Sequence, residues 1–161
     1  MTKKIQLTTH TDLGAPTYHV EKLWAHLAKA YPGDAVEYYL GGPGPFSLEV
    51  ALRMIGAPKS YPPKSVCIIP HYCGINKNDT IVFYVVHEDR ELIVSPEITV
   101  KRTKTIGLFP RLGLVNSLKG CIYGNTEREK LAVCDGWENS QEMFLHFLSR
   151  DLTGKFKIIK F

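Results

Sequence analysis

The chain has 161 residues, of which 44% are hydrophobic and 22% charged, so it suits one domain, and two full domains would be cramped. No apolar run approaches the roughly 20 residues that cross a bilayer, and the N-terminus lacks the apolar stretch of a secretory signal. We therefore expect a soluble, cytoplasmic protein with no membrane partner. The four cysteines form no CxxC pair, and Cys67 sits in an apolar run, so we expect a buried thiol there and neither a metal site nor a cofactor.

The N-terminal part reads as a small αβ unit. Residues 5–9 have the β-branched content of a strand, and residues 35–41 read as a second strand. Between them, residues 17–31 predict a helix whose apolar stripe contains Val20, Leu23, Trp24 and Leu27.

The strongest break in the sequence is "GGPGP", residues 41–45, because its glycines are flexible and its prolines cannot continue a strand ladder. We place a boundary there, between an N-terminal αβ extension at residues 1–45 and a main domain at residues 46–161. A short helix at residues 46–56 is expected to open the main domain.

The middle of the chain predicts short antiparallel strands separated by turns. Runs rich in Val, Ile, Tyr and Thr occur at residues 65–70, 80–87, 91–95 and 98–104. Residues 106–125 read as an extended loop with one strand in it. No long helices separate most of these strands, so we expect an α+β protein built on a small β-barrel or strongly bent sheet.

The C-terminus combines a helix with a final strand. Ser140, or a residue next to it, is the expected N-cap for "QEMFLHFLSR", and Met143, Phe144, Phe147 and Leu148 fall on one helical face. The run "KFKIIKF" at residues 155–161 then alternates as a strand does. A terminal strand tied into the sheet would close the barrel and hold the helix across its mouth.

The segment from "NTEREKLAV" through "DGW", "QEMFLHFL" and "FKIIKF" resembles the C-terminal signature of ASCH domains, which are small barrels of the PUA-like superfamily. The likeness covers roughly residues 46–161. It implies a PUA-like antiparallel barrel with a helix before the closing strand. Some ASCH proteins are implicated in the hydrolysis of acylated nucleosides or in RNA cleavage, so the resemblance also implies a possible hydrolase.

The sequence departs from the ASCH motif GxKxxExR. At that place it reads "GAPKSYPPK", residues 56–64, with neither an acid nor an arginine at the expected positions. If the chain is an enzyme, the candidates are Lys59 or Lys64 as the activated amine or base, with Glu49 as the carboxylate partner. The departure favours a non-catalytic role.

Two long windows contain no acidic residue: residues 50–78 and residues 98–126. We expect the segments around Lys59 and Lys101 to line one basic cleft that binds DNA or RNA, although scattered lysines would equally suit an ordinary solvated surface. Tyr61 is the candidate for base stacking, or else a tyrosine that packs on the barrel. The candidate phosphate contacts are Lys59, Lys64, Lys101, Arg102, Lys104 and Arg111.

The sequence therefore predicts a nucleic-acid-binding protein. The alternatives are a hydrolase acting on a modified nucleoside or RNA, and a protein–protein interaction module that uses "GGPGP" and the N-terminal helix. The choice between DNA and RNA, and the oligomeric state, stay open.

Overall fold

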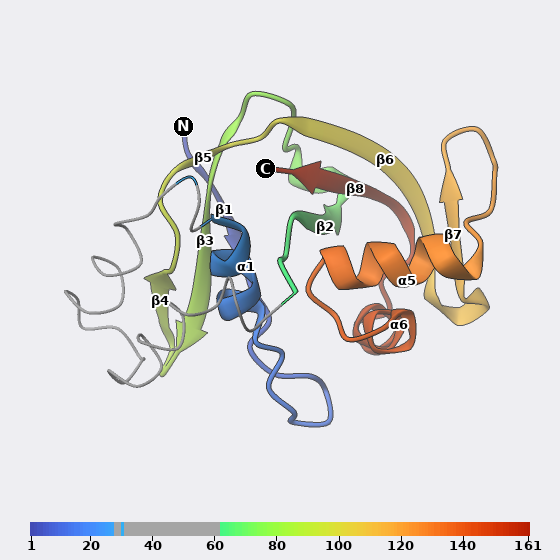
Figure 1. Cartoon of the computed structure of the whole chain (residues 1–161), viewed down its shortest axis with the longest axis horizontal. Coiled ribbons are helices and arrows are strands. Elements are labelled where there is room, and N and C mark those ends of the chain that lie inside the picture. The colour runs from blue at the N-terminus through green and yellow to red at the C-terminus, as the bar shows by residue number, and fades with distance from the viewer. Residues whose placement is uncertain (28–29, 31–61) are drawn as a thin grey trace.

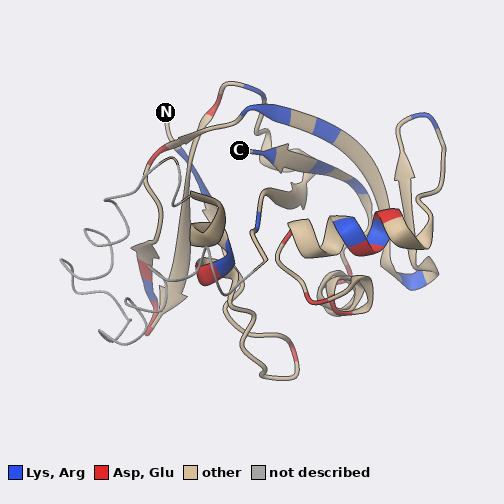
Figure 2. Cartoon of the chain, viewed as in Figure 1, with Lys and Arg blue, Asp and Glu red and all other residues tan. Residues whose placement is uncertain are grey.

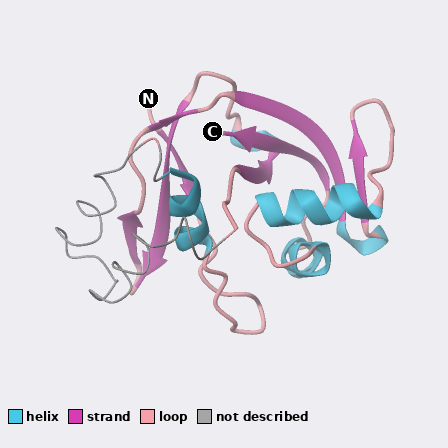
Figure 3. Cartoon of the chain, in the orientation of Figure 1, coloured by secondary structure: helices cyan, strands magenta, loops and turns pink. Residues whose placement is uncertain are grey.

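A computed structural model of the chain describes residues 1–27, 30 and 62–161 (Figure 1). The strand predicted at residues 35–41, the boundary at 41–45 and the helix predicted at 46–56 lie outside the described residues. Within them, the protein is α+β with two mostly antiparallel sheets, as Figure 3 shows.

The first sheet has the order β1-β3-β4, and β5 also pairs with β3. Strand β1 runs parallel to β3, whereas β4 and β5 are antiparallel to it. The antiparallel pairing expected for the middle of the chain holds for β3, β4 and β5, whereas β1 precedes that stretch and runs parallel to β3, which the long connection between them allows. The strands are β1 (Lys3–Gln6), β3 (Thr80–His87), β4 (Arg90–Ile93) and β5 (Ile98–Thr99).

The second sheet is antiparallel throughout and has the order β2-β8-β6-β7. The last strand of the chain, β8, lies between β2 and β6, so the prediction that the C-terminus is tied into a sheet is confirmed. Residues 106–125, predicted as an extended loop with one strand in it, contain the end of β6 and all of β7. The strands are β2 (Val66–Pro70), β6 (Arg102–Phe109), β7 (Leu114–Ser117) and β8 (Gly154–Lys160).

Two hydrophobic clusters lie on opposite faces of the second sheet, because successive side chains of a strand point to opposite faces. Ile159 belongs to the cluster shared with the first sheet and with Trp24 of α1. Ile106 belongs to the cluster shared with Met143 of α6 and with α5. The helices are α1 (His19–Leu27), α5 (Asn125–Cys134) and α6 (Ser140–Ser149).

Helix α1 packs into the first cluster by the predicted stripe. Val20, Leu23, Trp24 and Leu27 are all buried, which confirms that prediction. The indole Nε1 of Trp24 donates a hydrogen bond of 2.8 Å to the carbonyl oxygen of Val94, so the buried ring leaves no unpaired donor. The N-terminal residues thus share a core with the strands that follow.

The described strands do not close into a barrel, so that part of the fold prediction was wrong. The sheets are joined where the chain passes directly from β5 to β6, since the backbone N–H of Val100 bonds Asp79 while that of Lys101 bonds Lys160. Among the described strands, β1 is at the edge of the first sheet and β2 is at the edge of the second. The backbone N–H of Ile68 in β2 donates to the Asp135 carboxylate at 3.2 Å, so a side chain takes the place of a neighbouring strand.

The N-cap of helix α6 is the residue directly before its first residue. Asn139 is the N-cap, and its side-chain oxygen accepts a hydrogen bond of 2.9 Å from the backbone N–H of Glu142. The prediction placed the cap at Ser140 or next to it, and the structure places it one residue before Ser140. The hydroxyl of Ser140 donates instead to the carboxylate of Glu129 in α5, which ties the two helices together.

Candidate nucleic-acid interface and ligand pocket

The predicted site residues are distributed over several places. Glu49, Lys59 and Tyr61 lie outside the described residues. Lys64 is only 1% exposed, so its ammonium does not face solvent. Arg111, in the short helix Pro110–Leu112, pairs with the carboxylate of Asp151 at 2.8 Å.

The second sheet contains no acidic residue in any of its four strands. Each of the two acid-free windows supplies one of the strands that flank β8: β2 and β6. The last ten residues of the chain are also free of acids, and β8 comes from them. Figure 2 shows lysine and arginine on β6 and β8, in contrast to the mixed charges of α5.

Three exposed cations lie on the face of this sheet that also contributes to the hydrophobic cluster with α5 and α6, which we call the α5–α6 cluster. Arg102 stands directly opposite Lys160 in the β6–β8 register, and Lys104 is two residues further along the same face. Like charges directly opposite each other destabilise a strand pair. Within the described part of the chain, none of the three forms an ion pair with an acid. We call Arg102, Lys104 and Lys160 the basic strip.

An aromatic side chain borders the basic strip. The ammonium of Lys104 lies 5.0 Å from the centre of the Tyr123 ring and donates a hydrogen bond of 2.5 Å to the Tyr123 hydroxyl. The ring is half-buried against the α5–α6 cluster. Tyr123 therefore combines a fixed position with proximity to a cation, the arrangement on which bases stack in single-strand binders.

The other lysines of β8 do not join the strip. Lys155 is exposed, but it pairs with Gly107 in the register and so points to the opposite face. Lys157 is buried on that opposite face and donates hydrogen bonds of 2.8 Å to the carbonyl oxygen of Ile75 and to the side chain of Asn76. Lys101 precedes β6 and is exposed.

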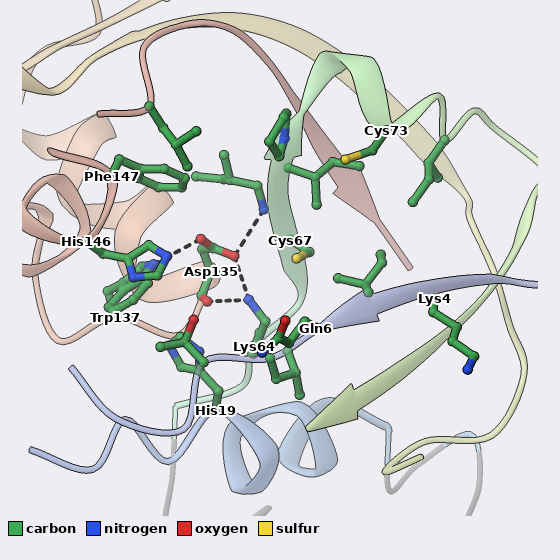
Figure 4. Close-up of a pocket in the computed structure, with 18 residues that line it drawn as sticks. Lys4, Gln6, His19, Lys64, Cys67, Cys73, Asp135, Trp137, His146 and Phe147 are labelled. Atoms are coloured by element: carbon green, nitrogen blue, oxygen red, sulfur yellow. Dashed lines mark hydrogen bonds and ion pairs between the residues drawn. The ribbon is translucent and has the colours of Figure 1, made fainter. Parts of the chain in front are cut away.

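A pocket of about 230 Å³ lies between the edge strands β1 and β2, where a closed barrel would pair them (Figure 4). Its walls come from β1, β2, the N-terminus of α1, the turn after α5, and α6. Apolar side chains make up most of the lining, and the polar groups gather around Lys64 and Asp135. The basic strip does not line this pocket, so the structure describes two separate sites.

Lys64 and Asp135 form a buried ion pair in this pocket. The Lys64 ammonium lies 2.5 Å from Asp135 Oδ1 and also donates to the backbone carbonyl of Asp135. Asp135 Oδ1 further accepts from Ile68, and Oδ2 accepts a 3.0 Å hydrogen bond from the indole of Trp137. Burial raises the pKa of Asp135, while Lys64 and these hydrogen bonds oppose that rise.

Trp137 lies between two histidines of the pocket wall. His19 meets its ring edge-on at 4.7 Å, and His146 lies at 4.6 Å with the planes tilted by 39°. Burial holds the pKa of His19 well below its usual range and lowers that of His146 to about 4, with Arg150 contributing to the latter. Both imidazoles are therefore neutral at pH 7.

These shifts predict that acid destabilises the protein. Below pH 6.5 the unfolded chain protonates His146, whereas the folded protein does so only near pH 4, so the free energy of unfolding falls through that window. The variant His146→Phe keeps an aromatic ring on Trp137 without titrating. From pH 7 to 5 we expect it to lose about 1 to 2 kcal/mol less stability than wild type, allowing for partial exposure. Urea unfolding at both pH values measures this, and equal losses would contradict it.

Local sequence patterns do not predict several residues of the two sites. In the sequence, Asp135 and Trp137 stand out only as part of the turn motif "DGW", and Lys160 only as part of a strand. The acid-free C-terminal ten residues were a signal that would have added Lys160 to the basic residues. No comparable signal pairs Lys64 with Asp135, because they are 71 residues apart.

No helix in residues 1–27 or 62–161 has the length and hydrophobicity needed to cross a membrane. No protein-family model, no curated protein and no solved structure matches the chain. The function must therefore be inferred from the sites themselves.

Proposed function

We propose that this protein binds nucleic acid without catalysis, with the basic strip holding the phosphates. The observation that carries the proposal is that Arg102 and Lys160 lie directly opposite each other in a sheet whose strands contain no acid. Their mutual repulsion has a cost in the free protein, and a polyanion would relieve it. Tyr123, beside Lys104, offers a ring on which an unpaired base can stack.

The fold is consistent with this proposal at the level of architecture. A terminal strand preceded by a helix, and a chain that passes from one sheet into the other, suit the PUA-like and ASCH-like arrangement that the sequence resembles. We therefore propose a PUA-like fold that is open between β1 and β2. The phosphate chemistry of the strip suits both DNA and RNA, because both carry the same backbone charge.

Salt dependence tests the proposal. If the strip contacts three phosphates, the affinity for a single-stranded oligonucleotide should fall with a slope of about −2 in log K against log salt. That slope corresponds to about a 20-fold loss of affinity between 50 and 200 mM salt. Fluorescence anisotropy of labelled DNA and RNA oligonucleotides measures it. Absence of binding to both at 50 mM salt would refute the proposal.

One observation bears on the alternative that the protein is a hydrolase: Lys64 has a carboxylate partner in a pocket. That partner is Asp135, whereas Glu49 lies outside the described residues. A lysine nucleophile needs its neutral amine, and a carboxylate at 2.5 Å stabilises the ammonium instead. The geometry therefore favours holding a ligand over attacking it.

The alternative of a protein-docking module relied on "GGPGP" and the N-terminal helix. The former lies outside the described residues. Helix α1 is buried at every position but His26, and His26 Nε2 is hydrogen-bonded to the Phe161 carbonyl at 2.8 Å. The helix thus has little free surface for a partner.

A further inference from the structure

The ion pair in the pocket has hydrogen-bonding capacity to spare. A lysine ammonium has three N–H donors, and Lys64 uses two of them, on the carbonyl and on Oδ1 of Asp135. Among the described residues the third has no acceptor. In the described part of the chain, Asp135 Oδ2 accepts only from Trp137, which leaves it room for one more donor. A free donor and a free acceptor thus lie side by side in the wall of the pocket.

His146 adds a second donor. Its Nδ1 lies 2.8 Å from a guanidinium nitrogen of Arg150, which can only donate, so the ring proton is on Nε2. His146 also lines the pocket, as Figure 4 shows together with Asp135 and Lys64. The residues that line the pocket therefore include Lys64 and His146, which carry donors, and Asp135, which carries an acceptor.

Among the described residues, the charges at the pocket balance at pH 7 when Lys4 is counted with its partner Glu91. The charges of Lys64 and Asp135 cancel, and the burial of both histidines keeps them neutral. Lys4, at one end of the lining, is paired with Glu91 at 2.6 Å. A phosphate or carboxylate would therefore enter without a compensating charge, at a high cost in desolvation.

The size and lining of the pocket favour a flat ring. About 230 Å³ is smaller than the 300 Å³ or more of pockets that hold drug-sized ligands. Isoleucines from β1 and β2, together with Leu7, Phe147 and Leu152, provide apolar walls. Cys73, in the short helix His71–Cys73, is exposed and also lines the pocket, so it marks the entrance.

We propose that this pocket binds a neutral planar heterocycle that carries a hydrogen-bond acceptor next to a donor, as the pairing edge of a nucleobase does. The third N–H of Lys64 donates to the acceptor of the ring, and Asp135 Oδ2 accepts from the adjacent N–H. The attached sugar or chain points out past Cys73. This site is independent of the basic strip, so either proposal can fail alone.

Protection of Cys73 from alkylation tests the proposal on the wild-type protein, so no variant has to fold. Iodoacetamide reacts with exposed thiols, and peptide mass mapping separates Cys73 from Cys121, which is exposed but does not line the pocket. Burial raises the pKa of Cys67 to about 12, which keeps it unreactive. We expect about 10 mM 1-methyluracil or 1-methylcytosine to slow alkylation of Cys73 about fivefold and leave Cys121 unchanged.

Two matched ligands make the test specific. 1,3-Dimethyluracil has the same ring but lacks the N–H donor, so it should give little protection; protection equal to that by 1-methyluracil would overturn the proposed edge recognition. Inorganic phosphate should not protect, and protection by it would show an anion site instead. Failure of both ring ligands to protect Cys73 would exclude the site. The variant Arg102→Ala/Lys104→Ala/Lys160→Ala should retain full protection by 1-methyluracil, because the strip does not line the pocket.

Discussion

Replacing Asp135 with asparagine is expected to lower the free energy of unfolding by about 3 to 5 kcal/mol, because the substitution leaves the Lys64 ammonium buried without a counter-charge. Both side chains are almost inaccessible, with exposed fractions of 2% for Lys64 and 5% for Asp135. Lys64→Met should be similarly destabilising, since it leaves the carboxylate unpaired. Urea unfolding monitored by tryptophan fluorescence measures both effects.

The double variant Lys64→Met/Asp135→Asn provides the control. With neither charge present, the penalty for an unpaired ion disappears, and the asparagine oxygen can still accept from the backbone of Ile68. We expect the double variant to be more stable than the sum of the two single effects by at least about 2 kcal/mol. Additive losses would show that the two residues do not act as an ion pair.

Removing the basic strip is expected to abolish most of the affinity for nucleic acid. The variant Arg102→Ala/Lys104→Ala/Lys160→Ala should bind a single-stranded oligonucleotide about 100-fold more weakly at 50 mM salt and show almost no salt slope, because no counterions are released. Folding should not suffer, since all three side chains are exposed and repel one another. Anisotropy titration, with circular dichroism to check the fold, measures the outcome.

Lys155→Ala is the matched control for this variant. Lys155 is on the same strand as Lys160 and equally exposed, but it points to the opposite face of the sheet. Its removal lowers the net charge by one without touching the strip, so affinity should change by less than about threefold. If Lys155→Ala weakened binding as much as Lys160→Ala, the overall charge and not the strip would be the cause.

In our two proposals, polyanion binding and ligand selection belong to separate sites. The basic strip has uncompensated positive charge in solvent, whereas the pocket has a cancelled pair of charges in an apolar environment. The opening between β1 and β2 makes this separation possible, since Asp135 occupies the edge of β2 and leaves room for the pocket.

Local patterns in the sequence determined the elements that depend on neighbouring residues. The apolar stripe of α1, the strand at 80–87, the helix near residue 140 and the terminal strand follow from residue periodicity and capping, which act over a few positions. The acid-free windows likewise identified β2 and β6 as uncharged or basic. Only tertiary structure decided which cations face solvent, because alternation defines two faces of a strand without saying which is covered. Lys155 and Lys157 show this, the first exposed and the second buried two residues later. The pairing of Lys64 with Asp135 and the opening between β1 and β2 also depend on contacts between distant segments, which no local pattern encodes.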